Sequence, residues 1–275
     1  MLSVIIPAHN EAALIGRCLQ AVLSASGDML VEIIVAANGC DDETVSIAQS
    51  YQMQTKALGW KLTVLDLPKG GKLGALNAAD EVARGEQRLY LDADVLISTA
   101  LLDQIHAMLE CSQPRYASGT LIIPRPNSFV SRAYRATYQK VPFMQQGVPG
   151  AGVFAMNMAG RARWGEWPDI ISDDTFARLQ FSAEERFKVK ATYQWPLVEG
   201  WKNLVAVRRR QNAGVDEIRE KYPELLANDE TPNMGLFGKL KLAALNPVGF
   251  AVYAGVALAV RLTQPKGRGD WRRGR

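Results

Sequence analysis

Hydrophobic positions in the first 125 residues alternate between short β-branched runs and longer stretches with helical spacing. The short runs predict strands, and the longer stretches predict amphipathic helices. Strands that alternate with helices of this length indicate βαβ units, a mostly parallel sheet and right-handed crossovers. The predicted strands are residues 2–6, 31–36, 62–67 and 88–91, and the predicted helices are residues 12–26, 43–53, 73–83 and 101–111.

Three polar loops follow the ends of predicted strands, at residues 7–11, 37–42 and 92–94. In open α/β sheets, ligands bind beyond the carboxyl ends of the strands, so these loops are the first candidates for a binding site. After residue 125 the pattern becomes irregular, with repeated prolines and a glycine-containing loop over residues 147–152. We expect this second half to complete the sheet and to carry a second ligand-facing surface, rather than to form a separate domain.

The C-terminal segment contains an uncharged run over residues 242–260, bounded by Lys241 and Arg261. Pro247 suits the first position of a helix, which would continue to Leu262 and be roughly 24 Å long. A hydrocarbon core of about 30 Å is slightly too thick for that length. The favoured interpretation is a helix in a membrane interface, and a buried core helix and a full span remain open. In the interfacial case the headgroups would be contacted by Trp271, Arg272, Arg273 and Arg275.

Composition and charge restrict the class of protein. The chain has 275 residues, of which 48% are hydrophobic, enough for a sizeable core and too many for a disordered chain. The net charge is +4, but residues 261–275 alone hold six basic residues and one aspartate, a balance of +5, which leaves −1 for the rest. We therefore expect no nucleic-acid partner and assign the positive charge to the tail.

The cysteines and the N-terminal residues indicate a compartment. Cys18, Cys40 and Cys111 show no CxxC spacing, which suits a reducing environment and no zinc site. The first residues have no basic segment, and their apolar run stops at Pro7, so no signal peptide is expected. The working expectation is a cytosolic chain.

Two carboxylates, Asp92 and Asp94, follow the predicted strand over residues 88–91. Where a strand stops pairing, both can turn toward one cation or one charged ligand. Mg²⁺ and Mn²⁺ prefer oxygen ligands and commonly share a diphosphate with the substrate. By itself the pattern is more typical of two solvated turn aspartates, so it needs support from other motifs.

A second acidic motif, Ser172-Asp173-Asp174-Thr175, precedes a helical stretch. Aspartates at a helix start cap backbone N–H groups and suit the positive end of the helix dipole, which is the stronger interpretation of this motif alone. A carboxylate in this place would also serve as a general base for a hydroxyl nucleophile.

A third motif, Lys69-Gly-Gly-Lys72, leads into the predicted helix over residues 73–83. It brings a cation and backbone amides to a helix N-terminus, which favours an anion. Because Leu73 follows Lys72, the motif is not a GxxxxGK[ST] phosphate-binding loop. GxGxxG is absent from the sequence, so a dinucleotide-binding interpretation loses its main support.

The order and spacing of these motifs are more specific than any one of them. Together they resemble the family 2 glycosyltransferases, inverting enzymes of the GT-A fold that transfer a sugar from a nucleotide donor, and in particular bacterial members of polysaccharide biosynthesis. The resemblance covers about residues 1–215, and the first 95 carry most of it. The motifs are SVIIPAHNE at 3–11, VAANGCDDET at 35–44, GKLGALN at 71–77, DAD at 92–94 and SDDT at 172–175.

The resemblance implies an α/β GT-A fold, with a Rossmann-like, mostly parallel central sheet flanked by helices. Residues 1–240 would form the glycosyltransferase domain, with a nucleotide-binding half over 1–125 and an acceptor-facing half over 126–240. Residues 241–275 would add an apolar helix and a basic tail that associate with a membrane.

The resemblance also implies roles for single residues. Pro7, His9 and Glu11 would lie under the nucleotide, and Asn38 and Asp42 would contact base and ribose. Lys72 would lie near the uridine or diphosphate, and Gly150 would belong to a small-residue loop against the donor or acceptor sugar. Asp92 would face the ribose or the metal, Asp94 would coordinate Mg²⁺ or Mn²⁺, and Asp174 would be the catalytic base.

Three departures from the family pattern limit these assignments. Many members have Asp-Asp-Gly-Ser where this chain has Ala37-Asn38-Gly39-Cys40, which removes the usual carboxylate contact to the base. In place of the QxxRW of processive members there is an arginine run over residues 208–210, which favours transfer of a single sugar. That run is either a diphosphate or phospholipid contact or a solvated basic stretch. The only histidines are His9 and His106, so diphosphate and water must complete the metal shell.

The expected activity is transfer of one sugar, with inversion, from a nucleotide-diphosphate sugar such as a UDP-sugar to a saccharide or lipid-linked acceptor. Asp174 would deprotonate the acceptor hydroxyl during an in-line displacement, and the metal would neutralise the departing diphosphate. The expected location is cytoplasmic, peripheral at the inner face of the cell membrane.

Two alternatives stay open. One is a nucleotide-sugar-binding protein without turnover. The other is a haloacid-dehalogenase-like phosphohydrolase with Asp92 as nucleophile. Such phosphohydrolases carry the DxD near the chain start and have Thr or Val two places after it, whereas here 91 residues precede the motif and Val95-Leu96 follow it.

Overall fold

A computed structural model describes residues 1–25, 27, 29–232 and 234–263. The chain forms two compact units that interleave along the sequence. The first unit comprises Met1–Ile122, Val148–Asp169 and Phe176–Trp195, and the second comprises Ile123–Gly147, Ile170–Thr175 and the chain from Pro196 onward. The functional division at residues 125 and 240 stays a prediction.

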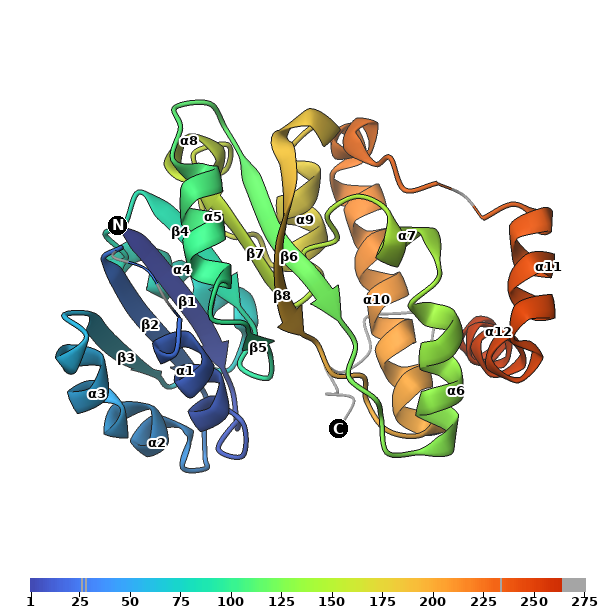
Figure 1. Ribbon diagram of the computed structural model, residues 1–275, viewed down its shortest axis with the longest axis horizontal. Coiled ribbons are helices and arrows are strands. Elements are labelled where there is room, and N and C mark those ends of the chain that lie inside the picture. The colour runs from blue at the N-terminus through green and yellow to red at the C-terminus, as the bar shows by residue number, and fades with distance from the viewer. Residues whose placement is uncertain (26, 28, 233, 264–275) are drawn as a thin grey trace. The chain divides into compact units, whose positions relative to one another are not determined.

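The first unit is built on an eight-stranded sheet with the order β3-β2-β1-β4-β7-β6-β8-β5 (Figure 1). Its parallel half consists of β1 (Leu2–Ala8), β2 (Val31–Asn38), β3 (Lys61–Leu67) and β4 (Gln87–Leu91). The four predicted strands are therefore confirmed, each within two residues at either end. Three of these strands, β1, β2 and β4, are buried over their whole length, which explains why apolar residues occur on both faces of each strand.

The other half of the sheet is mixed, so the expectation of a mostly parallel sheet holds for β1 to β4 and only in part here. It consists of β7 (Val153–Asn157), β6 (Tyr116–Ile122), β8 (Arg186–Gln194) and β5 (Leu96–Ile97). Strand β7 is antiparallel to both β4 and β6, β6 is parallel to β8, and β5 is antiparallel to β8. The connection from β6 to β7 does not cross to the opposite end of the sheet, so β7 runs antiparallel to β6.

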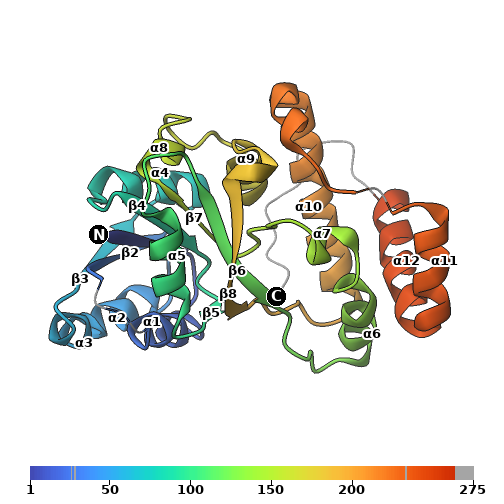
Figure 2. The ribbon, with the colours of Figure 1, turned by 45° about the horizontal axis from the view of Figure 1, so that its top comes forward.

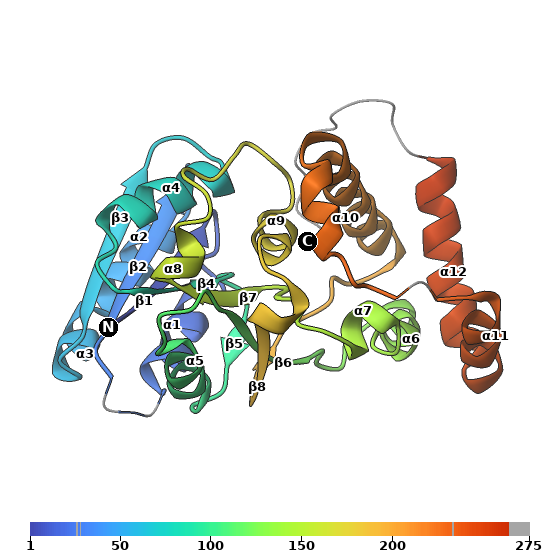
Figure 3. The ribbon, with the colours of Figure 1, turned by 90° about the horizontal axis from the view of Figure 1, so that it is seen from above.

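Helices cover both faces of the sheet (Figure 3). On one face, α1 (Ile15–Leu23) and α5 (Leu101–Leu109) pack against alternate strand residues such as Val4 and Leu89. On the other face, α4 (Lys72–Val82) contacts β1 and β2. The predicted helix over residues 43–53 is divided at Tyr51 into α2 (Thr44–Ser50) and α3 (Gln52–Ala57). The shorter helical elements are α8 (Met158–Arg161), α9 (Asp173–Leu179) and the 3₁₀ turn η1 (Ala183–Glu185).

The described part of the second unit is helical (Figure 2). Helix α12 contacts α6, α10 and α11. The elements are α6 (Phe129–Tyr138), α7 (Pro142–Gln145), α10 (Trp201–Lys221), the 3₁₀ helix η2 (Pro223–Asn228), α11 (Leu236–Leu245) and α12 (Pro247–Leu262), and the first residues of α9 also belong here.

Helix α12 has the predicted bounds, because Pro247 occupies its first turn and Asn246 caps it through a bond from Gly249 N to Oδ1. One side of α12 is buried at Val256 and Val260, whereas Leu258 and Leu262 are exposed. Within residues 1–263, apart from the undescribed positions, no helix is both long and apolar enough to cross a membrane. The predicted basic tail, including Trp271, Arg272, Arg273 and Arg275, lies outside the described residues.

Candidate functional site

The loops that follow β1 and β2 are joined by hydrogen bonds at the carboxyl edge of the sheet. His9 Nδ1 donates to the backbone oxygen of Asn38 at 2.6 Å, and Asn38 Nδ2 donates to the oxygen of Ala8 at 2.8 Å. The Asn38 side chain is only 3% exposed, so in this structure it holds backbone segments together. Pro7 lies inside β1, opposite Ala36 of β2. The predicted contact of Asn38 with a base stays a prediction.

Asp42 makes a second connection between the same two loops. Its Oδ2 accepts from the backbone N–H of Ala12 at 3.1 Å, and its Oδ1 accepts from Thr44 N at 2.9 Å. Glu11 N in turn donates to Thr44 Oγ1 at 2.7 Å. Slight burial would raise the pKa of Asp42, but the bonds from Thr44 and Ala12 outweigh it and hold that pKa below its usual value. Asp42 is thus a charged anchor for the segment that carries His9 and Glu11.

Lys72 lies at the N-terminus of α4, beside the same edge. The preceding Gly71 donates its N–H to Asn38 Oδ1 at 2.9 Å and has φ of +141°, a conformation that favours glycine. The Nζ of Lys72 lies 2.8 Å from Asp92 Oδ1. The loop before α4 is therefore connected to both β2 and the end of β4.

Asp92 and Asp94 lie on the turn after β4. Both are partly exposed, whereas the intervening Ala93 and Val95 are buried in the core, so burial alternates along the turn. The backbone N–H of Asp92 donates to Gly152 O at 2.8 Å, which fixes the turn to the segment before β7. The two carboxylates therefore extend from a well-anchored turn.

Negative charge gathers around the buried thiol of Cys18 in α1. Burial raises the pKa of Cys18, and the charges of Asp94, Asp92 and Glu11 raise it further. These three carboxylates therefore all lie close enough to act on one sulfur atom. Among the residues that the structure describes, no group of three or more His, Cys, Asp or Glu side chains is arranged to hold a metal by itself. Two carboxylates suit a cation that takes its other ligands from a diphosphate and water.

The small-residue loop before β7 is constrained by close packing. Gly150 and Gly152 have φ of +67° and +78°, and an added Cβ would meet the Tyr116 hydroxyl at the first and the Trp195 ring at the second. Glycine is thus required here for backbone and packing reasons. A contact of Gly150 with a sugar stays a prediction.

The segment that carries Asp173 and Asp174 belongs to the second unit and packs against α10. Ile171 N donates to Glu217 Oε2 at 2.8 Å, and Gly214 leaves no room for a Cβ beside the Ser172 hydroxyl. Asp173 is 4% exposed, whereas Asp174 is partly exposed, with its Oδ1 accepting from Thr175 N at 2.7 Å. Of the two aspartates, Asp174 is the one that a ligand can reach.

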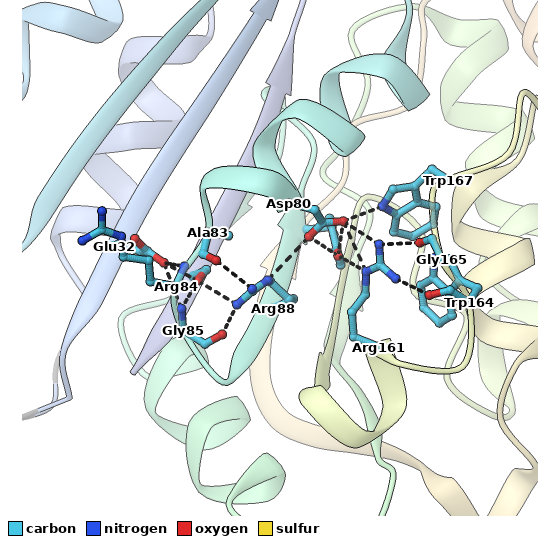
Figure 4. Close-up of polar contacts among 12 residues, drawn as sticks. Glu32, Asp80, Ala83, Arg84, Gly85, Arg88, Arg161, Trp164, Gly165 and Trp167 are labelled. Carbon is cyan, nitrogen blue, oxygen red and sulfur yellow. Dashed lines mark hydrogen bonds and ion pairs between the residues drawn. The ribbon is translucent and has the colours of Figure 1, made fainter.

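A buried charge network connects α4 with β4 and with the segment after β7, and no local sequence pattern indicates it (Figure 4). Asp80 of α4 accepts from Tyr90 OH at 2.9 Å and from Trp167 Nε1 at 2.8 Å. Its Oδ2 also pairs with Arg161 Nη2 at 3.0 Å, and its Oδ1 lies 3.5 Å from Arg88 Nε. Loss of one partner from a buried ion pair costs about 3–5 kcal/mol, so this network stabilises the first unit.

The same network fixes the segment between α8 and residue 169. Arg161 donates to the backbone oxygens of Trp164 and Gly165, at 2.8 and 2.9 Å. Asn77 of α4 exchanges two hydrogen bonds with the backbone of Trp167. Asn77 is the last residue of the GKLGALN motif, but no local pattern reveals its partners, because they are 90 residues away.

Most of the predicted donor residues are therefore neighbours in the first unit. The contacts described above connect His9, Glu11, Asn38, Asp42, Lys72 and Asp92 through adjoining loops, and Asp94 follows on the same turn as Asp92. Asp174 belongs to the second unit.

The amino-acid sequence is similar to those of known glycosyltransferases. Residues 3–159 match the sequence profile of Glycosyl transferase family 2. Glycosyltransferase AglD of Haloferax volcanii is 30% identical over 143 residues, which are 48% of this chain and 22% of that protein. The dolichyl-phosphate beta-glucosyltransferase of Drosophila melanogaster is 32% identical over 130 residues, 44% of this chain and 39% of that one. The chain thus spans well under half the length of either relative.

Solved structures show the same fold. The mannosyltransferase PcManGT from Pyrobaculum calidifontis, in complex with GDP-Man and Mn²⁺, aligns with a TM-score of 0.61 and 21% identity over 95% of this chain and 75% of that one. TarS 1–349 from S. aureus, in complex with UDP-GlcNAc, aligns with a TM-score of 0.53 and 15% identity over 97% and 93% of the two chains. At these identities the likeness establishes the fold, and the family follows from the profile match over more than half of the sequence. With its strand-end loops and its DAD turn, the chain belongs to glycosyl transferase family 2.

Proposed function

We propose that the protein transfers a single sugar, with inversion, from a nucleotide-diphosphate sugar, a UDP-sugar in the first instance, to a saccharide or lipid-linked acceptor. The observation that carries the proposal is the joined set of loops at the carboxyl ends of β1, β2 and β4, where Lys72 pairs with Asp92. Ligands of open α/β sheets bind at this edge. Family membership supports the same assignment.

The donor diphosphate would lie beside Lys72, Asp92 and Asp94. Two carboxylates with oxygen donors suit Mg²⁺ or Mn²⁺ that is shared with a diphosphate, and Lys72 adds a second positive charge. Asp94 would be the principal ligand, and Asp92 would divide its two oxygens between Lys72 and either the metal or the ribose. A bound divalent cation supplies charge neutralisation to a departing nucleoside diphosphate.

Asp174 would act as the general base. Its partial exposure favours it over the buried Asp173, and the bond from Thr175 N to Oδ1 orients the carboxylate. The carboxylate would remove the proton of the acceptor hydroxyl as that oxygen attacks the anomeric carbon. A positioned base of this kind contributes about 10² to 10⁴ in rate.

The acceptor would be presented at a membrane surface. Helix α11 has no buried residue, and Leu236, Phe237 and Leu240 on it are 74%, 82% and 59% exposed. Lys239 and Lys241 lie on the same helix, and residues 261–275 carry a balance of +5. Exposed apolar side chains beside basic residues suit an anionic bilayer interface. The Drosophila relative is named a dolichyl-phosphate beta-glucosyltransferase, and dolichyl phosphate is a lipid phosphate. We therefore propose a cytoplasmic protein that is peripheral at the inner face of the cell membrane.

The proposal can be tested by incubating the full chain with Mn²⁺ and a panel of UDP- and GDP-sugars. Each nucleotide sugar is scored for slow hydrolysis, for anomeric configuration of the released sugar, and for an increase in melting temperature. Binding and turnover of one donor, with inversion, would support the proposal. Donor binding without turnover with any acceptor would indicate a binding protein, and release of inorganic phosphate from phosphate esters would indicate a phosphohydrolase.

A further inference from the structure

Arg208 of α10 lies in a tyrosine cage formed by Tyr134 and Tyr138 of α6 and Tyr253 of α12. The guanidinium carbon is 5.6 Å from the centre of the Tyr253 ring. The Tyr134 ring centre is 5.3 Å from that of Tyr138 and 5.4 Å from that of Tyr253. All of these residues belong to the second unit.

The charge of Arg208 has no anionic counterpart in this cage. In the part of the chain that the structure describes, no carboxylate forms an ion pair with Arg208. Burial raises the pKa of Tyr134 to about 12 and raises that of Tyr138 as well, so both phenols stay neutral at physiological pH. A guanidinium stays protonated in proteins, and its desolvation is unfavourable unless an anion compensates it.

The cage is accessible to a ligand and lies near the proposed base. Arg208 is half-buried rather than sealed, although Tyr134 and Tyr138 are only 4% and 6% exposed. The negative charge of Asp174 acts on Tyr138, in addition to the larger effect of burial. An anion at Arg208 would thus bind in the neighbourhood of Asp174.

We propose that Arg208 and the tyrosine cage bind a phosphate group of the acceptor, the group through which a saccharide is joined to its lipid. A planar guanidinium recognises phosphate oxygens through paired hydrogen bonds, and neutral phenols add donors without repulsion. Helix α12 supplies Tyr253 to the cage and exposes Val248, Leu258 and Leu262, which suits a ligand with an anionic group and an apolar chain. This inference rests on the proposed function, in which Asp174 deprotonates a hydroxyl of the same acceptor.

The test measures binding of three probes to the full chain, namely farnesyl phosphate below its micellar concentration, farnesol and inorganic phosphate. Arg208→Gln should weaken farnesyl phosphate binding about tenfold or more and leave farnesol binding unchanged. Arg219→Gln is the matched control, because Arg219 lies on the same helix, is exposed and pairs with Asp216. It should bind all three probes like the wild type. Arg208→Lys, which keeps the charge and loses the planar fork, should fall between wild type and Arg208→Gln.

Further measurements separate the possible outcomes. Tighter binding of farnesyl phosphate than of inorganic phosphate would identify a lipid-borne phosphate, and equal binding of the two would identify a soluble phosphorylated acceptor. Tyr253→Phe, which removes one hydroxyl and retains the ring, should also weaken phosphate binding. It provides an independent test if Arg208→Gln fails to fold.

Equal farnesyl phosphate affinity in Arg208→Gln and wild type would overturn the inference. A loss of UDP–Mn²⁺ binding in Arg208→Gln would overturn it too, because the guanidinium would then serve the donor. Failure of the wild type to bind any nucleotide would instead reject the proposed function.

Discussion

The ammonium group of Lys72 lies 2.8 Å from Oδ1 of Asp92, and this ion pair joins the first residue of α4 to the first residue after β4. The two side chains are 27% and 34% exposed, so a ligand can reach both. The pair brings a positive and a negative group to the same place, beside Asp94. A diphosphate with a divalent cation offers complementary charges to both.

Replacement of Lys72 should weaken donor binding. We expect Lys72→Gln to raise the dissociation constant of UDP in the presence of Mn²⁺ about tenfold or more, because a charge-assisted hydrogen bond to the diphosphate is lost. Isothermal titration calorimetry measures this. Lys56→Gln, on the exposed end of α3, is the control and should bind UDP like the wild type. Unchanged affinity in Lys72→Gln would place the diphosphate elsewhere.

Donor binding should also depend on a divalent cation through Asp94. Asp94→Ala should nearly abolish transfer and should remove the increase in UDP affinity that Mn²⁺ produces in the wild type. Asp66→Ala is a matched control, because Asp66 is an exposed carboxylate near the end of β3. Transfer at full rate in excess EDTA would contradict the metal role.

The two aspartates at the start of α9 should respond differently to the same change. Asp174→Asn keeps shape and hydrogen-bonding capacity but removes the base, so turnover should fall by about 10² or more with little change in donor affinity. Asp173→Asn, at a residue that is 4% exposed, should act mainly on the melting temperature. Both kcat and thermal unfolding are measured for each variant. Greater loss of kcat in Asp173→Asn than in Asp174→Asn would assign the base to Asp173.

Glu32 should make stability dependent on pH in the acid range. Burial by itself would raise the pKa of Glu32, but hydrogen bonds from Ser3 Oγ and from the N–H groups of Arg84 and Gly85 outweigh it and hold the pKa below the ordinary value of 4.5. Because the lowered pKa belongs to the folded state, the carboxylate stabilises the protein above about pH 4.5 and this stabilisation is lost as pH falls through the folded pKa.

Urea unfolding between neutral pH and the acid limit of folding measures this effect. Glu32→Gln should lower the free energy of unfolding at neutral pH by about 1–3 kcal/mol, since the bonds to its carboxylate are weakened. The variant should also lose less stability than the wild type as the pH falls below 4.5. Glu86→Gln, an exposed glutamate in the same part of the chain, is the control. Parallel pH profiles for Glu32→Gln and wild type would show that Glu32 contributes nothing to the acid sensitivity.

Membrane association should depend on α11 rather than on the core of the second unit. We expect Ser substitution of Leu236, Phe237 and Leu240 together to abolish co-sedimentation with anionic vesicles and to leave the melting transition intact, because α11 buries no residue. Truncation after Leu245 is a poorer test, since it removes Val256 and Val260, which are fully buried. Met53→Ser, at a residue that is 78% exposed in the first unit, is the control. Continued co-sedimentation of the triple variant would exclude α11 as the contact.

The features of this protein that depend on local pattern could be predicted from its residues. Short runs of mainly apolar residues bounded by polar loops predict strands, so β1 to β4 and the loops at their ends follow from the residues themselves. The start of α12 at Pro247 was equally predictable, because proline fixes φ and lacks the N–H that the first turn leaves unpaired anyway. The DAD turn followed from its place directly after β4.

The contacts between distant residues could not be predicted from local pattern. The ion pair of Lys72 with Asp92 joins residues 20 positions apart, and the bonds of Asp80 to Arg161 and Trp167 join residues more than 80 positions apart. Hydrophobic periodicity carries no information about pairing at such sequence separations. The reversal of β7 was hidden for the same reason, because strand direction depends on the path of the connection. The cage around Arg208 likewise needs α6, α10 and α12 to pack together. The spacing of hydrophobic residues indicates which face of a helix or strand is buried. Which residues that face contacts depends on packing between segments that are distant in the sequence.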